Sequence, residues 1–177
     1  MKLARDLGIT SPLQEEPGLV IGGNNNTVSV LEMTGAYAAA ANGGRWNRPH
    51  GIARVWDARL CEDSEDVKTC EEPNFDFSND EQPKQILSPD VAETMTDILQ
   101  RVITEGTGRN AFLGLDEAGK TGTTDDEVDL WFIGYIPSKY IATGIWLGND
   151  DNSSTQGRSK DAAKLWANYM GKLINQQ

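Results

Sequence analysis

The stretch that decides the fold runs from residue 118 to residue 147 and reads AGKTGTTDDEVDLWFIGYIPSKYIATGIWL. It contains three strand-like segments, at 118–124, 130–136 and 140–147, and Pro137 ends the second of them. The second and third segments are apolar on both alternating faces, which predicts a sheet that is covered on both sides. Because the links between the segments are short, we expect an antiparallel meander.

Helical patterns stand on both sides of this meander. A first helix is expected to begin near Thr27, with caps from residues 24–26, and to end at the glycine pair 43–44. A second begins after Ser88, a good N-cap residue, and a third starts at Ser159. The apolar positions of the second helix recur with a helical period, at Val91, Met95, Ile98, Leu99, Val102 and Ile103. Helices before and after an antiparallel meander predict an α+β fold, a sandwich of sheet and helices.

The charge of the chain excludes several classes of partner. Its 177 residues carry 16 basic and 27 acidic side chains, a formal net charge of −11. Nucleic acid is therefore not expected as a partner, because phosphate binding requires clustered Lys and Arg, and an anionic membrane surface is disfavoured as well. No apolar run reaches the roughly 18–20 residues of a membrane span, and no basic-then-apolar leader opens the chain.

The acidic charge is concentrated at residues 60–83, where nine acidic residues stand against one base, Lys68. We interpret this segment as an exposed acidic loop or insertion that keeps the chain soluble. A calcium site is the alternative, although the spacing lacks the alternating acidic order of a calcium loop. The loop also holds the two cysteines, Cys61 and Cys70. They form either a local disulfide, if the protein lies outside the cytoplasm, or two unpaired thiols.

Residues 114–121 fit the phosphate-loop pattern G-x-x-x-x-G-K-[ST], which would make the chain a nucleotide-binding protein. Such a loop must follow a buried strand and open a helix that holds phosphate. Residues 122–124, Gly-Thr-Thr, are poor helix formers and lead toward a strand. Asp116 and Glu117 would also place two carboxylates inside a loop meant for phosphates. The pattern therefore favours a second interpretation.

In the second interpretation, residues 118–124 form a strand that displays Lys, Thr and Thr. In an extended chain Lys120 and Gly122 face one way, and Thr121 and Thr123 face the other. Lys120 offers a cation for a carboxylate, the threonines offer hydroxyl donors, and the backbone offers an N–H for an oxyanion. Gly122 lets a substrate or another backbone approach closely. Beside a nucleophile, such a strand would bind an acyl substrate.

Other motifs of the chain stand in an order that resembles a known family. They are Met33-Thr34-Gly35-Ala36-Tyr37, Ala41-Asn42-Gly43-Gly44, Glu105-Gly106-Thr107-Gly108, Asp129-Leu130-Trp131-Phe132-Ile133-Gly134-Tyr135 and Ile145-Trp146-Leu147-Gly148-Asn149-Asp150. Together with Lys-Thr-Gly they resemble the C-terminal part of the transpeptidase domain of class A penicillin-binding proteins, which are bifunctional peptidoglycan synthases. The resemblance covers nearly all of residues 1–177, with the acidic loop at 60–83 as its poorest part. It implies a transpeptidase-like α+β fold that is incomplete in this chain.

The resemblance also implies serine acyl transfer. In the family, the Ser of Ser-x-x-Lys attacks the D-Ala–D-Ala end of a stem peptide, and an amine from a neighbouring strand resolves the acyl-enzyme. β-Lactams acylate the same Ser. By the family's motif, Lys120 would bind the carboxylate of substrate or drug and tune proton transfers, and Thr121 and Thr123 would hydrogen-bond that region. The Thr123 N–H would form half of the oxyanion hole, and Gly122 would keep the strand surface open.

The chain departs from the family in one respect, since it contains neither Ser-x-x-Lys nor Ser-x-Asn. Both lie upstream in the family, so we expect this chain to be inactive without the remainder of the transpeptidase domain. The alternatives are a non-catalytic truncated protein that binds wall peptides or a partner and, more remotely, a nucleotide-binding protein. The resemblance implies stem peptides and β-lactams as partners, and no cofactor or metal. It also implies a membrane-anchored full-length protein in the extracytoplasmic or periplasmic space, at the outer face of the inner membrane.

Overall fold

The structure, a computed structural model, describes residues 1–22, 26–70, 72–77 and 82–176. The chain divides into two compact units. The first, which we call the sheet unit, comprises Met1–Trp46 and Gln85–Gln177, and the second, the hairpin unit, comprises Asn47–Lys84. Within the described ranges, no helix is both long enough and apolar enough to cross a membrane.

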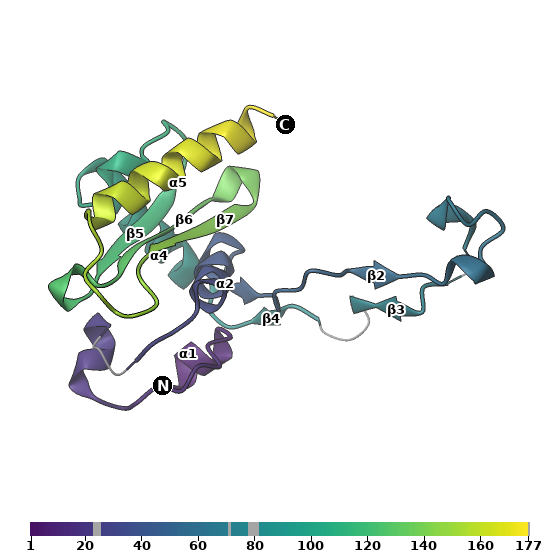
Figure 1. The fold of residues 1–177 in the computed structure, drawn as a ribbon, viewed down its shortest axis with the longest axis horizontal. Coiled ribbons are helices and arrows are strands. Elements are labelled where there is room, and N and C mark those ends of the chain that lie inside the picture. The colour runs from purple at the N-terminus through teal and green to yellow at the C-terminus, as the bar shows by residue number, and fades with distance from the viewer. Residues whose placement is uncertain (23–25, 71, 78–81, 177) are drawn as a thin grey trace. The chain divides into compact units, whose positions relative to one another are not determined.

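The sheet unit is built on three antiparallel strands in the order β5-β6-β7 (Figure 1). β5 spans Ala118–Thr123, β6 spans Leu130–Ile136 and β7 spans Ile141–Leu147. Short 3-10 turns at Asp125–Glu127 and Pro137–Lys139 connect them. The antiparallel meander that the sequence predicts is therefore confirmed.

Three long helices flank this sheet: α2 (Val30–Ala41), α4 (Pro89–Thr104) and α5 (Ser159–Ile174). α2 packs against β6 and β7, α4 against β5, and α5 against all three strands (Figure 1). The predicted α+β class is confirmed. The remaining elements of this unit are short: α1 (Lys2–Asp6), β1 (Arg45–Trp46), β4 (Lys84–Gln85, which begins in the hairpin unit) and 3-10 turns at Pro17–Ile21 and Arg109–Ala111.

Two glycines show that α5 and α2 cover opposite faces of the sheet. A Cβ atom on Gly134 would lie 3.0 Å from the Trp166 ring of α5. A Cβ atom on Gly144 would lie 2.2 Å from the Thr34 hydroxyl of α2. Gly134 pairs with Thr143, the neighbour of Gly144, so the two glycines face opposite sides of the sheet. Each glycine lets its helix approach the sheet closely.

The core of the sheet unit divides between the two faces. On the α5 face Trp166 is fully buried, meets Phe132 edge to face at 5.3 Å between ring centroids, and donates its Nε1–H to the Thr143 carbonyl at 3.1 Å. On the other face Tyr135 and Ala118 pack with Leu99 and with partly buried residues of α2 and α4. β6 is therefore buried on both sides, as its apolar run predicts.

The helix starts confirm two predictions and correct one. Ser88 caps α4, since its Oγ accepts from the Val91 N–H at 3.3 Å, and α5 begins at Ser159. The predicted start of the first helix near Thr27 is wrong, because α2 begins at Val30 with Ser29 as its N-cap. Of the three predicted caps, Asn24 and Asn25 lie outside the described residues, and the Asn26 Oδ1 accepts from the Gln14 N–H at 2.6 Å instead of capping the helix.

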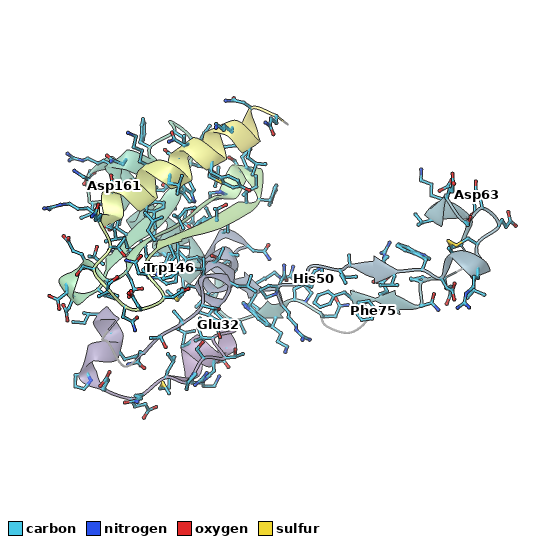
Figure 2. All side chains as sticks on the ribbon, viewed as in Figure 1. Glu32, His50, Asp63, Phe75, Trp146 and Asp161 are labelled. Carbon is cyan, nitrogen blue, oxygen red and sulfur yellow. A yellow bond between two sulfur atoms is a disulfide. The ribbon has the colours of Figure 1, made fainter. Side chains whose placement is uncertain are left out.

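The hairpin unit pairs β2 (Arg54–Val55) with β3 (Phe75–Asp76). Beyond them lie 3-10 turns at Ala58–Leu60 and Val67–Thr69 and a disulfide between Cys61 and Cys70. The disulfide lies at the end of the unit that carries Asp63 (Figure 2). Of the two states that the sequence leaves open for these cysteines, the structure has the bonded one. The unit also extends beyond the predicted acidic loop at 60–83, since it starts at Asn47.

Candidate functional site

The predicted site residues lie on β5, which is an edge strand. β6 pairs with all six residues of β5, and no described strand pairs with its other side. Side chains alternate along it, so Lys120 is exposed whereas Thr121 is only 8% exposed. The free edge of a strand can present its N–H and C=O groups to an extended peptide. β5 therefore combines a cation with an open backbone edge.

A groove of about 580 Å³ adjoins β5 and is lined by residues 120–123, so all four predicted site residues meet there. Trp131 and Ile133 of β6 line it beside β5, and Met33 and Tyr37 line it from α2. The remaining lining comes from the segment before α2, from the β5–β6 turn and from the loop after β7: Ile21, Gly22, Asn26, Thr27, Val28, Thr124, Asp125, Asp126, Val128, Asp129 and Asn152. The groove thus combines apolar side chains with one lysine on β5 and three aspartates at the β5–β6 turn.

Lys120 and Gly122 shape the side of the groove formed by β5. The Lys120 Nζ donates to the Thr121 carbonyl at 2.8 Å, which holds the ammonium close to the strand. A Cβ atom on Gly122 would lie 3.2 Å from the Trp131 Cβ, a tight contact. A larger residue at position 122 would press on Trp131 and project into the groove. Gly122 therefore keeps this surface open.

Thr121 and Thr123 differ in their surroundings, although they share a face of the strand. Thr123 is exposed. The Thr121 Oγ1 lies 2.6 Å from the Thr107 Oγ1, in the turn that follows α4. The sequence marks Thr107 as part of a family motif but does not predict this contact, which joins residues fourteen positions apart.

The β5–β6 turn is held by the carboxylate of Asp129. Its Oδ2 accepts from the Thr124 hydroxyl at 3.0 Å, and its Oδ1 accepts from the Trp146 Nε1–H at 2.8 Å. The Asp129 N–H in turn donates to the Thr124 Oγ1 at 2.8 Å. These bonds tie the end of β5 to β7. They also fix Thr124 and Asp129, which line this part of the groove.

Tyr37 brings a neutral phenol to the groove. Burial raises the pKa of Tyr37, and the nearby Tyr135 raises it further. Burial also raises the pKa of Tyr135, against a smaller lowering by the hydrogen bond with Thr96. Both phenols therefore stay protonated at neutral pH.

The loop at 113–115 bears on the phosphate-loop alternative. The Glu117 carboxylate accepts from the backbone N–H groups of Leu113, Gly114 and Leu115 at 2.7, 3.1 and 2.8 Å. These are amides that a phosphate would need, and an acidic side chain of the chain itself already occupies them. Strand β5, not a helix, follows at Ala118. The geometry of this segment does not support nucleotide binding.

Glu32 anchors the segment that lines the groove before α2, and the sequence analysis missed it. Its carboxylate accepts from the N–H and hydroxyl groups of Thr10, Ser11 and Ser29 at 2.6–2.9 Å. Partial burial raises the pKa of Glu32, but hydrogen bonds from Ser11, Thr10 and Ser29 outweigh it, so the net pKa lies well below its ordinary value of 4.5. The capping-box pattern Ser29-x-x-Glu32 was the signal available in the sequence.

The other candidates do not join this site. His50 belongs to the hairpin unit, where its ring stacks on Phe77 at 3.7 Å and its Nδ1 lies 3.2 Å from the Arg48 carbonyl oxygen. Among the residues with described positions, no group of three His, Cys, Asp or Glu side chains could hold a metal ion.

The fold and the groove together define a class of protein. Residues 18–171 match the family model of the penicillin-binding protein transpeptidase domain. The chain therefore belongs to the transpeptidase domain family of penicillin-binding proteins.

Individual relatives agree with this assignment. The chain is 36% identical to penicillin-binding protein 1A of Aquifex aeolicus over 81% of its own length and 18% of the relative's. It is 35% identical to penicillin-binding protein 2D of Bacillus subtilis, over 96% of its length and 23% of the relative's. The chain thus spans about a fifth of the length of these relatives.

Solved structures share the fold. The penicillin-binding protein PonA1 of Mycobacterium tuberculosis superposes with a TM-score of 0.75 at 23% identity, over 98% of this chain and 49% of that one. Penicillin-binding protein 1A of Haemophilus influenzae superposes with a TM-score of 0.68 at 21% identity, over 96% of this chain and 30% of that one.

Proposed function

We propose that β5 is the carboxylate-binding strand of a serine D,D-transpeptidase, which cross-links peptidoglycan stem peptides and which β-lactams acylate. The observation that carries the proposal is the groove beside β5, where residues 120–123 meet along a free strand edge in a chain of this family. A ligand with an extended backbone and a terminal carboxylate fits a strand edge that bears one ammonium and two hydroxyls.

Each predicted residue has a role in this proposal. The Lys120 ammonium attracts the ligand carboxylate and takes part in proton transfer, and the Thr121 and Thr123 hydroxyls donate to the same carboxylate. The Thr123 N–H donates to the oxygen that becomes negative as the substrate carbonyl is attacked. Gly122 leaves room for the ligand backbone.

The nucleophile of the reaction is a Ser in a Ser-x-x-Lys sequence, which these 177 residues do not contain. Its oxygen attacks the carbonyl of the penultimate D-Ala, the peptide C–N bond breaks, and the terminal D-Ala leaves with the proton from the Ser. The amine of a second stem peptide then displaces the Ser from the acyl ester and forms the cross-link. We propose that the remainder of the transpeptidase domain supplies this Ser.

The same proposal places the protein outside the cytoplasm. Cell-wall synthesis by the family occurs there, and a disulfide such as Cys61–Cys70 persists in oxidising compartments. We propose that the full-length protein is membrane-anchored at the outer face of the inner membrane.

The test is labelling with a fluorescent penicillin. We expect the full-length polypeptide to be labelled covalently and the 177-residue chain alone to remain unlabelled, because the latter has no Ser-x-x-Lys. In the full-length polypeptide, Lys120→Ala should lower the labelling rate by about 30-fold or more, since it removes the charged partner of the carboxylate. Lys139→Ala, which removes an exposed lysine outside the groove, is the matched control.

Two outcomes would contradict the proposal. One is a full-length polypeptide that no penicillin labels, and the other is a Lys120→Ala variant that is labelled as fast as the Lys139→Ala control. The gene sequence upstream of the Met1 codon separates the non-catalytic alternative, because a transpeptidase requires Ser-x-x-Lys and then Ser-x-Asn in the same reading frame.

A further inference from the structure

We propose that Thr107 is a positioning residue for carboxylate recognition, which acts by orienting the hydroxyl of Thr121. The inference rests on the proposed function of β5 and deepens it. The observation behind it is the distance of 2.6 Å between the Thr107 and Thr121 Oγ1 atoms, at the short end of the range for hydroxyl pairs.

The turn that carries Thr107 is wound tightly onto the end of α4. The Gly106 N–H donates to the Arg101 carbonyl at 3.0 Å, and the Gly108 N–H donates to the Val102 carbonyl at 2.9 Å. A Cβ atom on Gly106 would lie 2.9 Å from the same Val102 oxygen. The glycines on both sides of Thr107 therefore allow a close turn that other residues would open.

The same turn rests against the sheet next to Thr121. A Cβ atom on Gly108 would lie 3.3 Å from the Phe132 ring, and Phe132 is the residue of β6 that pairs with Thr121. The turn is thus packed against the strand pair at the position of Thr121. This packing explains why Thr107, which is itself exposed, holds its hydroxyl at the Thr121 side chain.

The chemistry of the two hydroxyls gives this contact a direction. Each hydroxyl has one proton to donate and two lone pairs that accept. When Thr107 donates to Thr121, the Thr121 proton is left free for a third group; when Thr121 donates to Thr107, it is not. A carboxylate bound along the free edge of β5 only accepts, so it selects the first arrangement. The result is a chain of hydrogen bonds from Thr107 through Thr121 to the carboxylate, in which each bond strengthens the next.

The burial of Thr121 makes it dependent on this neighbour. At 8% exposure its hydroxyl has little access to water, and Thr107 is the side chain that bonds it. Without the Thr107 hydroxyl, the orientation of the Thr121 O–H bond would be less ordered, and its oxygen would be less polarised. The loss should weaken binding of a charged carboxylate and should matter little for a neutral ester, which accepts hydrogen bonds more weakly.

The experiment compares acylation of the full-length polypeptide by benzylpenicillin and by its methyl ester. We expect Thr107→Val to lower the second-order rate constant for the free acid about three- to tenfold, the range for loss of one hydrogen bond between neutral groups, with less than about twofold change for the ester. Thr107→Ser, which keeps the hydroxyl, should restore the rate for the acid. Thr104→Val is the matched control, because the Thr104 hydroxyl donates to the Gln100 carbonyl at 3.3 Å, within α4 itself.

Each other outcome overturns the inference. An equal fall in the rates for acid and ester would assign Thr107 a merely structural role, and an unchanged rate for the acid would assign it none. Thr107→Ala serves as the second variant if Thr107→Val does not fold, and the same acid-to-ester comparison applies to it. A wild-type polypeptide that neither compound acylates would refute the proposed function, and this inference with it. If the wild type is acylated, the proposed function stands, and the Thr107 variants test this inference alone.

Discussion

The sheet unit and the hairpin unit are held together by different interactions. Every described residue that is buried belongs to the sheet unit, where Trp166 and Tyr135 are among the largest. No described residue of the hairpin unit is buried. Several of its apolar side chains are exposed instead: Ile52, Val55, Leu60, Val67 and Phe75.

The hairpin unit uses covalent and local bonds in place of a core. Cys61 and Cys70 are joined, and carboxylates fold the nearby backbone, as Asp63 does by accepting from the Glu65 N–H at 2.9 Å and Asp66 by accepting from the Lys68 N–H at 3.0 Å. A segment this short cannot bury enough apolar surface to fold by packing alone. The candidate site lies in the sheet unit, where the packing of helices onto the sheet brings together side chains from several elements, such as Thr107 and Thr121.

The largest effect should come from removing the centre of the packed core. We expect Trp166→Ala to lower the free energy of unfolding of the sheet unit by about 3–5 kcal/mol, because a fully buried ring leaves a cavity. Tyr169→Ala, on the half-exposed side of the same helix, should cost much less. Urea unfolding followed by circular dichroism measures both. Equal costs for the two variants would mean that the sheet unit does not depend on this core.

The next effect should be confined to the hairpin unit. Replacing both cysteines, Cys61→Ser with Cys70→Ser, should lower its local stability by roughly 2–3 kcal/mol, because the short loop regains its freedom in the unfolded state. Hydrogen exchange should speed up at residues 54–77 and stay unchanged in β5–β7. Faster exchange in the sheet strands would show that the two units are not stabilised independently.

A smaller effect is expected at Glu32, where the sheet unit also uses polar bonds. Glu32→Gln should cost about 1–2 kcal/mol at pH 7, because it weakens a capping box and the bonds from Thr10 and Ser11. The folded-state pKa lies below the ordinary value of 4.5, so the stabilisation is present above that pH and is lost as the pH falls toward the folded-state value. The difference in the free energy of unfolding between wild type and variant should therefore shrink in acid. Glu93→Gln, at an exposed position of α4, is the matched control for replacing a carboxylate. A difference that grows in acid would contradict the lowered pKa.

The smallest effect is expected at the ion pair of the hairpin strands. The Arg54 Nε lies 2.8 Å from the Asp76 Oδ2, across directly paired residues. Because Arg54 is half exposed, Asp76→Asn should cost less than about 1 kcal/mol, measured as exchange of the Val55 amide. A cost above that of removing the disulfide would mean that the ion pair, and not the covalent bond, contributes most to the stability of the hairpin unit.

Much of the fold was predictable because its signals are local. The three strands of residues 118–147 follow from alternating apolar positions and short links, and α4 follows from Ser88 and a helical apolar period. The order of the short motifs indicated the family, which the comparisons confirm. The start of α2 was mistaken although its signal was local too, because the capping box at Ser29 was overlooked in favour of the nearby asparagines.

The sequence by itself determined the strands, the long helices and the strand that carries Lys120, because hydrogen bonds and apolar periodicity act between residues a few positions apart. Only the tertiary structure decided that Thr107 meets Thr121, that Glu32 binds Thr10 and Ser11, and that the groove gathers residues from α2, β5 and β6. These contacts join positions 14 to more than 80 apart in the chain. They form only when the helices pack onto both faces of the sheet, and no local pattern records which distant side chains that packing brings together.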